Sequence, residues 1–202
     1  MSISLETLKK CDKIKISQGG IIKMELKGTK TETNLQNAFA GESQARNKYT
    51  YFAGVAKENG YEQIAEYFLE TARNEQEHAR LWFEALNGGK MPTLEECLKM
   101  AAEGENYEWT SMYKDMAEDA RNEGFTRIAA QMDMVAKIEK EHEARYLSLL
   151  NNVKEDKVFE KEDEEVWICS KCGYKHTGKK APAVCPLCGY KQEVFSLFRQ
   201  DY

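Results

Sequence analysis

The sequence predicts a mainly α protein, an antiparallel four-helix bundle followed by a small metal-knuckle domain. Three observations lead to this fold class. The chain of 202 residues contains only three prolines, which leaves long stretches free to remain helical. Apolar residues recur in these stretches in alternating steps of three and four, the period of a helix with one buried face. Near the C-terminus, four cysteines form two Cys-x-x-Cys pairs, which are typical of a bound metal.

Composition excludes several classes of function. Charged residues make up 31% of the chain and the net charge is −5. No basic stripe stands out, and no apolar run approaches the roughly 18 residues of a membrane span. We therefore expect a cytoplasmic protein that binds neither nucleic acid nor a membrane. Two further cysteines, Cys11 and Cys97, lie outside the pairs and are expected to be isolated reduced thiols.

Residues 1–23 do not share the helical pattern. They carry five lysines and scattered isoleucines, without the apolar core or cleavage site of a secretory signal. We expect this extension to be disordered or weakly structured. A sharper hypothesis is that it is not native coding sequence, because Gln18-Gly19-Gly20 can be encoded as CAAGGAGG, a bacterial ribosome-binding sequence, before Met24. Detection of a peptide from residues 1–20 in the natural protein by mass spectrometry would exclude that hypothesis.

The bundle is expected over residues 24–152. Glycines follow the first three helices, where they favour the left-handed turn that ends a helix. Thr93, with Glu96 three residues later, forms a capping box that opens the third helix. The expected helices cover residues 33–59, 61–87, 93–122 and 125–151. Helices of about 26 residues span about 39 Å, and short turns between them favour an antiparallel bundle.

The C-terminal part of the chain has a different composition. Residues 153–165 are dense in charge and are predicted to be an acidic linker. Residues 166–202 are too few to hold a core without a staple such as a metal. Glycine follows the second cysteine of each pair, as in knuckles whose backbone N–H groups point at thiolates. His176 is expected to be a solvated loop residue. The four cysteines predict a tetrahedral site for iron or zinc at Cys169, Cys172, Cys185 and Cys188.

Each predicted helix carries potential metal ligands on its apolar face, which we call its seam. Three pairs of these ligands are three residues apart: Glu75 with His78, Glu105 with Glu108, and Glu139 with His142. Residues at this spacing lie about 60° apart around a helix, so the members of each pair point the same way. The seam ligands are Glu42, Glu75, His78, Glu105, Glu108, Glu139 and His142. Five carboxylates cannot share an apolar interior unaided, and no lysine or arginine lies in the seams to compensate them. Bound metal cations would compensate these negative charges.

The arrangement of these ligands is more specific than any one of them. A single glutamate on a long helix is usually a solvated surface residue. Here, two Glu-x-x-His pairs lie on the second and fourth helices, and seam glutamates lie on the first and third. This is the pattern of a bundle that holds two metals. Oxygen-rich ligation with one imidazole per metal suits iron or manganese better than zinc.

Four segments of the bundle resemble the helix motifs of the rubrerythrin family: FAGESQARNKYTYFA, ETARNEQEHA, AEGENYEWTSMY and EKEHEARY. The cysteine segment is similar to the family's C-terminal domain, and the resemblance covers residues 26–200. It implies a ferritin-like bundle with a non-haem di-iron centre. It also implies a rubredoxin-like domain with a single iron on four cysteines, where zinc can replace iron in a recombinant sample.

The resemblance also implies a role for each ligand. Glu75 and Glu139 would bridge the two irons. Glu42 would be terminal on one iron, and Glu105 with His142 on the other. Glu108 and His78 would exchange on the first iron as its oxidation state changes. Tyr49 and Tyr113 match aromatic positions beside the family's site, where hydrogen bonding to the ligands and simple packing are both open.

The activity implied by the resemblance is a peroxidase of the NADH peroxidase type, which reduces hydrogen peroxide to water and protects against oxidative stress. Rubredoxin or an NADH-dependent reductase would donate electrons, since the chain has no nucleotide-binding glycine loop. A homodimer or higher homo-oligomer is expected. Two alternatives stay open: a ferritin-like iron oxidase or storage protein, and a zinc-ribbon interaction module on a structural bundle.

Overall fold

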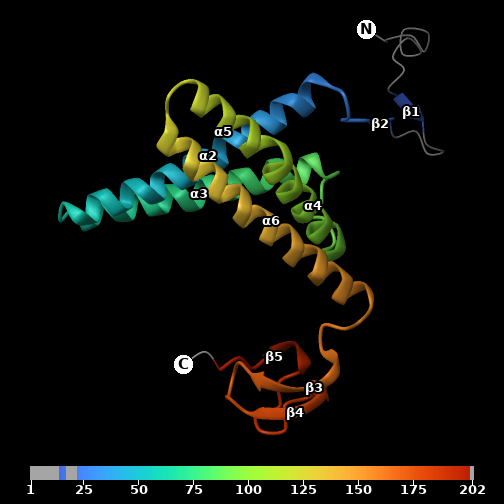
Figure 1. The fold of residues 1–202 in the computed structure, drawn as a ribbon. Coiled ribbons are helices and arrows are strands. Elements are labelled where there is room, and N and C mark those ends of the chain that lie inside the picture. Colours follow the sequence, from blue (N-terminus) through green and yellow to red (C-terminus); the bar gives the residue numbers. More distant parts are fainter. Residues whose placement is uncertain (1–13, 17–21, 201–202) are drawn as a thin grey trace. The chain divides into compact units, whose positions relative to one another are not determined.

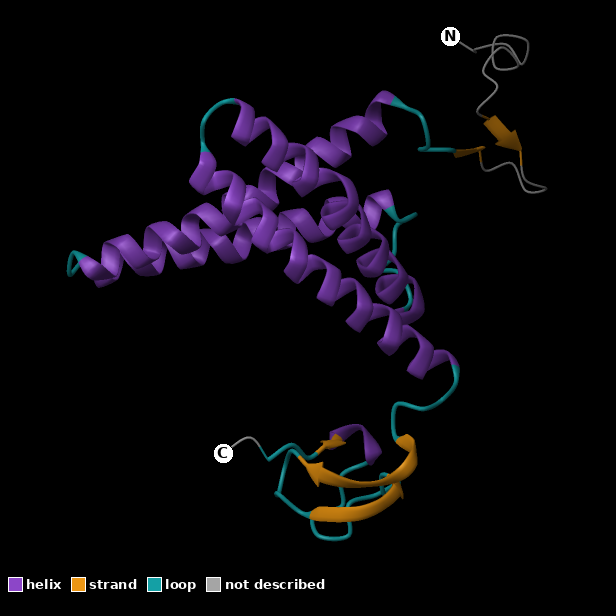
Figure 2. Cartoon of the chain, in the orientation of Figure 1, coloured by secondary structure: helices purple, strands orange, loops and turns teal. Residues whose placement is uncertain are grey.

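A computed structural model of the chain describes residues 14–16 and 22–200. It divides into two compact units, residues 1–92 and residues 93–202. Helices dominate both units, and the only larger sheet among the described residues lies near the C-terminus (Figure 2). The predicted class, mainly α with a small metal-knuckle domain, is confirmed. No helix in the described ranges is long and apolar enough to cross a membrane.

The first unit is built on two long antiparallel helices, α2 (Lys30–Glu58) and α3 (Glu62–Leu86), which lie side by side (Figure 1). The Thr29 side chain caps α2 by accepting a hydrogen bond from the backbone N–H of Glu32, so the helix starts a few residues earlier than expected. Gly60, at φ +79°, makes the turn between the helices. The buried side chains of this hairpin are all alanines: Ala53, Ala56, Ala65, Ala72 and Ala79.

Two short strands precede the hairpin. Strands β1 (Ile14–Ile16) and β2 (Ile22–Met24) pair antiparallel, with Ile14 opposite Met24. Within an extension predicted to be disordered or weakly structured, these six residues form a short ladder of backbone hydrogen bonds. Cys11 lies outside the described residues.

The second unit begins with α4 (Leu94–Tyr107), which Thr93 and Glu96 open with the predicted capping box. The helix expected to continue to Asn122 is interrupted. A π-helical segment, η1 (Glu108–Met112), separates α4 from α5 (Tyr113–Asn122). The wider turn coincides with hydrogen bonds from Asn106 and Trp109 that hold this stretch against the last helix, α6 (Thr126–Lys154).

The C-terminal domain is a three-stranded antiparallel sheet of β3 (Glu160–Cys169), β4 (Lys175–Lys180) and β5 (Phe195–Leu197), in the order β4-β3-β5. A short 3₁₀ helix, η2 (Gln192–Val194), precedes β5. The core of the C-terminal domain consists of Trp167, Cys169, Ala181, Cys185 and Phe195.

Two expectations for this region need correction. Residues 160–165, predicted as linker, form the first half of β3, where Glu160 pairs with Lys180 across the sheet and their side chains lie 3.0 Å apart. The strand extends to Glu160 because Glu160 pairs with Lys180 and Glu165 pairs with Gly178, with a shift in register between the two pairs. His176, predicted in a loop, lies on β4 opposite Trp167 and is partly buried.

Candidate metal centres

The first unit brings together three of the predicted ligands. Glu42 projects from α2, and Glu75 and His78 project from α3; one ligand atom from each lies within 4.8 Å of the others. His78 Nδ1 is 2.8 Å from Glu75 Oε2 and 3.9 Å from Glu42 Oε2. This group is called the first triad below. Its imidazole is half exposed, whereas Glu75 is only 16% exposed.

The second unit repeats the arrangement with another three ligands. Glu105 comes from α4, and Glu139 and His142 come from α6. His142 Nδ1 lies 2.6 Å from Glu139 Oε2 and 3.7 Å from Glu105 Oε2. In this second triad, as in the first, the Glu-x-x-His pair supplies a close contact and the neighbouring helix a longer one. The two triads therefore have the same composition and a similar geometry.

Both triads fit a metal. Ligand atoms bound at about 2 Å from one metal lie at most about 4 Å apart, close to the spread of each triad. In both, Nδ1 is the imidazole nitrogen that faces the carboxylates, so it is the nitrogen available to a metal. Two carboxylates with one imidazole per triad give the oxygen-rich set that suits iron.

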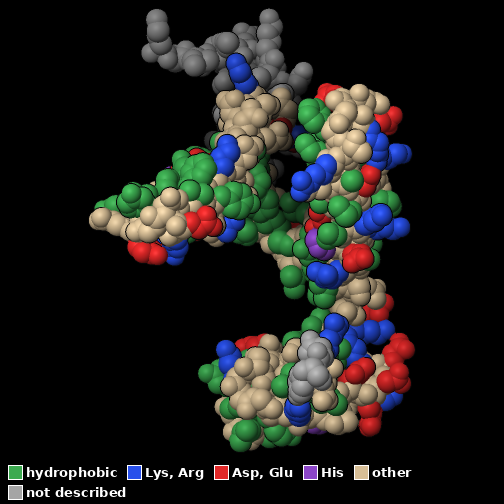
Figure 3. Space-filling model, turned by 60° about the vertical axis from the view of Figure 1, so that its left-hand side comes forward, with side chains coloured by type: hydrophobic (Ala, Val, Ile, Leu, Met, Phe, Trp, Pro, Cys, Tyr) green, Lys and Arg blue, Asp and Glu red, His purple; other side chains and the backbone are tan. Residues whose placement is uncertain are grey.

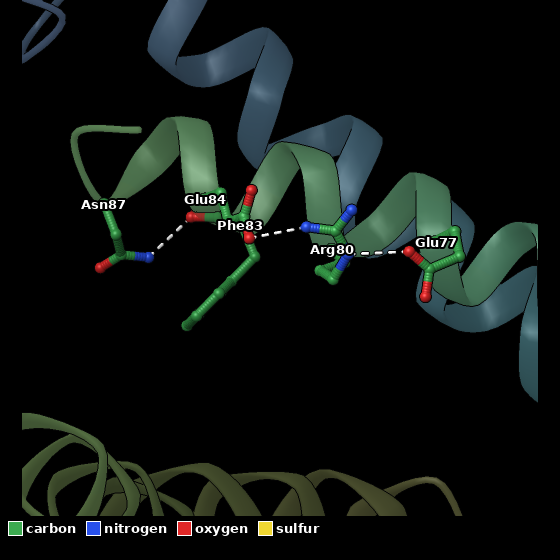
Figure 4. A network of polar contacts seen from close by, with 5 residues as sticks. All are labelled: Glu77, Arg80, Phe83, Glu84 and Asn87. Atoms are coloured by element: carbon green, nitrogen blue, oxygen red, sulfur yellow. Dashed lines mark hydrogen bonds and ion pairs between the residues drawn. The ribbon is translucent and has the colours of Figure 1, made fainter. Parts of the chain in front are cut away.

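No cationic side chain competes for the triads. Within the described ranges, no lysine or arginine forms an ion pair with any of the six triad residues. Arg80, two residues after His78, is held elsewhere: its Nε lies 2.8 Å from Glu77 and its Nη1 2.6 Å from Glu84 (Figure 4). The negative charge of the carboxylates is thus left for metal cations to balance.

The lack of a lysine or arginine partner is reflected in the pKa values of the second triad. Burial raises the pKa of Glu105, and a hydrogen bond and negative charge from Glu139 raise it further, against the opposing effect of His142. Glu108 adds another negative charge nearby. Acids crowded in this way favour the protonated form unless a cation binds.

Glu108 is not a member of either triad. It opens the π-helical segment, and its charge contributes to raised pKa values at both Glu105 and Tyr113. Burial is the main cause of the raised Tyr113 pKa, followed by the charges of Glu108 and Glu139. Tyr113 therefore lies within electrostatic reach of the ligands. Tyr49, by contrast, packs with Phe52 and Phe68 in an aromatic cluster.

A carboxylate that the sequence did not single out holds the second triad's helices together. Glu143, one residue after His142, accepts a hydrogen bond from Asn106 Nδ2 at 2.9 Å and from Trp109 Nε1 at 2.6 Å. The Lys140 ammonium lies 5.0 Å from the Trp109 ring centroid. The spacing of residues within a single helix cannot reveal these two hydrogen bonds, because the donors lie more than thirty residues from Glu143 in the sequence.

The four predicted cysteines also come together. Cys169 and Cys185 are buried, Cys188 is partly buried and Cys172 is exposed. The Sγ atoms of Cys169 and Cys188 are 3.7 Å apart, and those of Cys172 and Cys185 are 3.6 Å apart. A tetrahedron with metal–sulfur bonds of about 2.3 Å has edges of about 3.8 Å, so the geometry fits iron or zinc.

Backbone geometry favours thiolates at the two buried cysteines. Burial acts to raise the pKa of Cys185, but backbone N–H groups of Cys188 and Leu187, with neighbouring sulfurs, lower it to about 7. The pKa of Cys169 is shifted downward by the matching groups of Cys172 and Lys171, against the effect of burial. Gly173 and Gly189, at φ +77° and +75°, allow the turns that aim these groups.

Comparison with known proteins shows the family to which this chain belongs. A family profile described as rubrerythrin matches residues 33–150, and one described as the rubredoxin-like domain of rubrerythrin matches residues 167–196. The chain belongs to the rubrerythrin family. It is 48% identical to rubrerythrin-1 of Clostridium acetobutylicum, over 88% of this chain and 98% of that one. It is 49% identical to rubrerythrin of Porphyromonas gingivalis, over 88% of this chain and 94% of that one.

More distant members are also similar. Nigerythrin of Nitratidesulfovibrio vulgaris is 33% identical, over 83% of this chain and 86% of that one. A solved mixed-valence state of nigerythrin is 30% identical, covers 86% of this chain and 89% of its own, and gives a TM-score of 0.32. As a rubrerythrin-family protein, the chain is an oxidoreductase with residues for a di-iron site and for a rubredoxin-like four-cysteine site.

Proposed function

We propose that the chain is a peroxidase that reduces hydrogen peroxide to water, with electrons relayed through its four-cysteine domain. The observation that carries the proposal is the coexistence, in one chain, of two matched Glu/Glu/His triads and a four-thiolate site. A di-metal site alone would serve oxidation or storage equally well. A thiolate-bound iron adds a one-electron carrier, which a reductase of peroxide needs and a storage protein does not.

The two triads, with Glu108, would supply the seven ligands of a di-iron site. By the family resemblance, Glu75 and Glu139 would bridge the irons, Glu42 would be terminal on the first iron, and Glu105 and His142 would bind the second. Two ferrous ions bound there would supply the two electrons that, with two protons, convert one peroxide to two waters. Glu108 and His78 would be alternative ligands of the first iron. Support comes from the location of Glu108 at the head of a π-helical segment, since such segments recur at functional sites.

Electrons enter through the four-cysteine domain from an NADH-linked donor, either rubredoxin or a separate reductase. The exposed Cys172 and the partly buried Cys188 form the side of the thiolate cluster that a donor can approach. The buried cysteines lie on the side of the sheet core with Trp167 and Phe195. Electron transfer weakens steeply with distance, so the exposed side is the entry point.

Stopped-flow spectroscopy tests the assignment. The reduced, iron-loaded protein is mixed with hydrogen peroxide or with dioxygen, and reoxidation is followed by visible absorption. Peroxide should reoxidise the protein at least about tenfold faster, a difference of about 1.4 kcal/mol in activation free energy. Equal rates with dioxygen would favour the ferritin-like oxidase instead.

Two variants separate the centres in the same experiment. Glu75→Gln should abolish peroxide-driven oxidation while leaving the thiolate iron chromophore in place. Cys169→Ser should remove that chromophore and steady-state turnover, yet leave a single turnover of the chemically reduced protein with peroxide. A Glu75→Gln variant with undiminished peroxide turnover would contradict the site assignment.

A further inference from the structure

Glu143 on α6 holds two side chains of the neighbouring stretch of α4 and η1. Its Oε1 accepts a hydrogen bond from Asn106 Nδ2 at 2.9 Å, and its Oε2 accepts one from Trp109 Nε1 at 2.6 Å. This group of three side chains is called the clamp below. Each of its members comes one residue after a proposed iron ligand, namely Glu105, Glu108 and His142. The clamp therefore forms a second layer of side chains beside the ligands.

The clamp holds the start of the π-helical segment η1. Neighbouring residues of a helix lie only about 1.5 Å apart along its axis, so fixing the Trp109 ring also fixes the backbone from which Glu108 projects. The wide turn that begins there is closed by the backbone N–H of Tyr113, which donates to the Glu108 carbonyl. The Thr110 hydroxyl donates to the Asn106 carbonyl at 2.6 Å, a type of bond that bends helices. The start of η1 is thus tied both to α4 and to α6.

Apolar packing does not fix this segment by itself. Hydrophobic side chains reach the surface over much of the helical part (Figure 3). Tyr107 and Met116, on either side of η1, are 60% and 45% exposed. A cavity of about 420 Å³ lies between α4 and α6, bordered by Asn106 and Glu143, so the two helices do not pack closely there. The position of η1 therefore depends on the hydrogen bonds of the clamp.

The Trp109 indole is held by α6 at its edge and over its ring. Glu143 accepts the hydrogen bond from the edge, and the Lys140 ammonium lies 5.0 Å from the ring centroid. These two residues are three positions apart, so they share one face of α6. Because a cation over an indole ring is attracted to it, both contacts draw Trp109 toward the same face.

The segment held in this way carries Glu108, the proposed ligand that belongs to neither triad. Glu108 is partly buried. Burial is the largest cause of the raised pKa values of Glu105 and Tyr113, and the negative charge of Glu108 raises both further. Glu108 therefore lies within electrostatic reach of the ligands. A ligand that exchanges must leave a metal and return to the same point, which requires a fixed backbone beneath a movable side chain.

We propose that Glu143 is a positioning residue for Glu108. By holding the indole N–H of Trp109, it fixes the backbone of η1 so that the Glu108 carboxylate returns to the first iron when the site is oxidised. The inference rests on the proposed exchange of Glu108 with His78. An anionic ligand favours the ferric over the ferrous state, because it balances the additional positive charge. Loss of the clamp should therefore favour the reduced form of the di-iron site.

A redox titration of the iron-loaded full chain, followed by visible absorption, tests this role. Trp109→Phe keeps an aromatic ring and changes no charge, but removes the N–H donor. At a fixed ambient potential, the ratio of oxidised to reduced di-iron sites should fall at least about tenfold, which is about 30 mV for a two-electron couple. Tyr107→Phe, at the exposed neighbour of Glu108, is the matched control and should leave the ratio unchanged. The thiolate-bound iron of the same molecule is the internal reference and should not shift in either variant.

A double-mutant cycle shows whether the effect of Trp109 passes through Glu108. Glu108→Ala alone should lower the ratio at least as much as Trp109→Phe does. In the Glu108→Ala background, Trp109→Phe should then have no further effect. A general loosening of the second triad would instead lower the ratio equally in both backgrounds, and that result would overturn the positioning role. An unchanged ratio in Trp109→Phe would overturn it as well.

Amide hydrogen exchange gives a second readout, which does not depend on redox state. In Trp109→Phe, exchange at residues 108–113 should rise at least about tenfold, whereas exchange at residues 97–102 of α4 should stay the same. Unchanged exchange at residues 108–113 would show that the clamp does not hold η1.

The outcomes distinguish the proposals from one another. A wild-type ratio in Glu108→Ala would refute the exchange of Glu108 and with it the positioning role. A lowered ratio in Glu108→Ala with a wild-type ratio in Trp109→Phe would refute only the positioning by Glu143. Neither measurement uses peroxide, so the peroxidase proposal is decided separately, by turnover.

Discussion

Trp109 donates a hydrogen bond of 2.6 Å from its indole Nε1 to Glu143 Oε2. This bond fastens the π-helical segment, which starts at Glu108, to α6 at the turn that carries His142. Asn106 occupies the other carboxylate oxygen at 2.9 Å. One carboxylate thus sets the register between the helices that present the second triad.

Substitution Glu143→Gln should loosen that register. The amide retains one acceptor oxygen and loses the charge, and its NH₂ group turns a donor toward a donor. Because hydrogen bonds to charged groups contribute about 1.5–3 kcal/mol each, the free energy of unfolding should fall by about 1–3 kcal/mol. Urea unfolding followed by circular dichroism measures this. Glu141→Gln, on the exposed side of the same helix, is the control, and an equal loss in both variants would argue against the register role.

Glu108→Ala should slow peroxide turnover by at least about tenfold per bound iron, in the range seen when groups that support a metal are lost. The helices should stay intact, since alanine is a strong helix former. Steady-state turnover, normalised to iron content, gives the measurement. Glu103→Ala on the exposed face of α4 should leave turnover unchanged. Wild-type turnover in an iron-replete Glu108→Ala protein would exclude ligand exchange at this residue.

Most helix ends and the clustering of the Glu, His and Cys side chains were predictable because their signals are local. The ends of α2, α3 and α5 coincide with glycines at positive φ, such as Gly60 and Gly124, and the α4 capping box forms as expected. Residues three apart on a helix necessarily share a face, so Glu75 with His78 and Glu139 with His142 follow from spacing alone. The same holds for the cysteine knuckles.

Features that depend on other parts of the chain were not predictable. The π-helical segment adds one residue to a turn, which leaves the periodic pattern almost unchanged. Strand β3 begins six residues earlier than composition suggests, because Glu160 is paired by Lys180 on a neighbouring strand. Glu143 gains its importance from Asn106 and Trp109 on another helix.

The Glu160–Lys180 pair gives a prediction about pH. A hydrogen bond and the negative charge of Glu160 raise the pKa of Lys180 above its ordinary 10.5. Its stabilisation is therefore fully present below about pH 10.5 and is lost as pH rises through the folded-state pKa. Both side chains are more than half exposed, so the effect should be small.

Thermal unfolding of wild type and Lys180→Met from pH 9 to 12 measures this effect. The wild type should be slightly more stable at the lower end, and the two curves should converge at the upper end. Lys179→Met, at the exposed neighbouring position, controls for the loss of one positive charge. Curves that stay parallel over the whole range would show that the pair contributes nothing.

Removal of the metal should unfold the C-terminal sheet while sparing the helices. The core of this domain holds only five buried residues, and two of them, Cys169 and Cys185, are proposed ligands. A core of that size cannot offset the conformational entropy lost on ordering residues 160–200 unless a bound metal adds stability. Cys169→Ser should therefore raise amide hydrogen exchange in β3 and β5 by at least about a hundredfold, a loss of about 2.7 kcal/mol in local stability. Exchange in α2 and α3 should be unchanged, and Cys97→Ser on α4 should leave the sheet protected. A Cys169→Ser sheet that stays fully protected would show that packing of Trp167 and Phe195 alone sustains the domain.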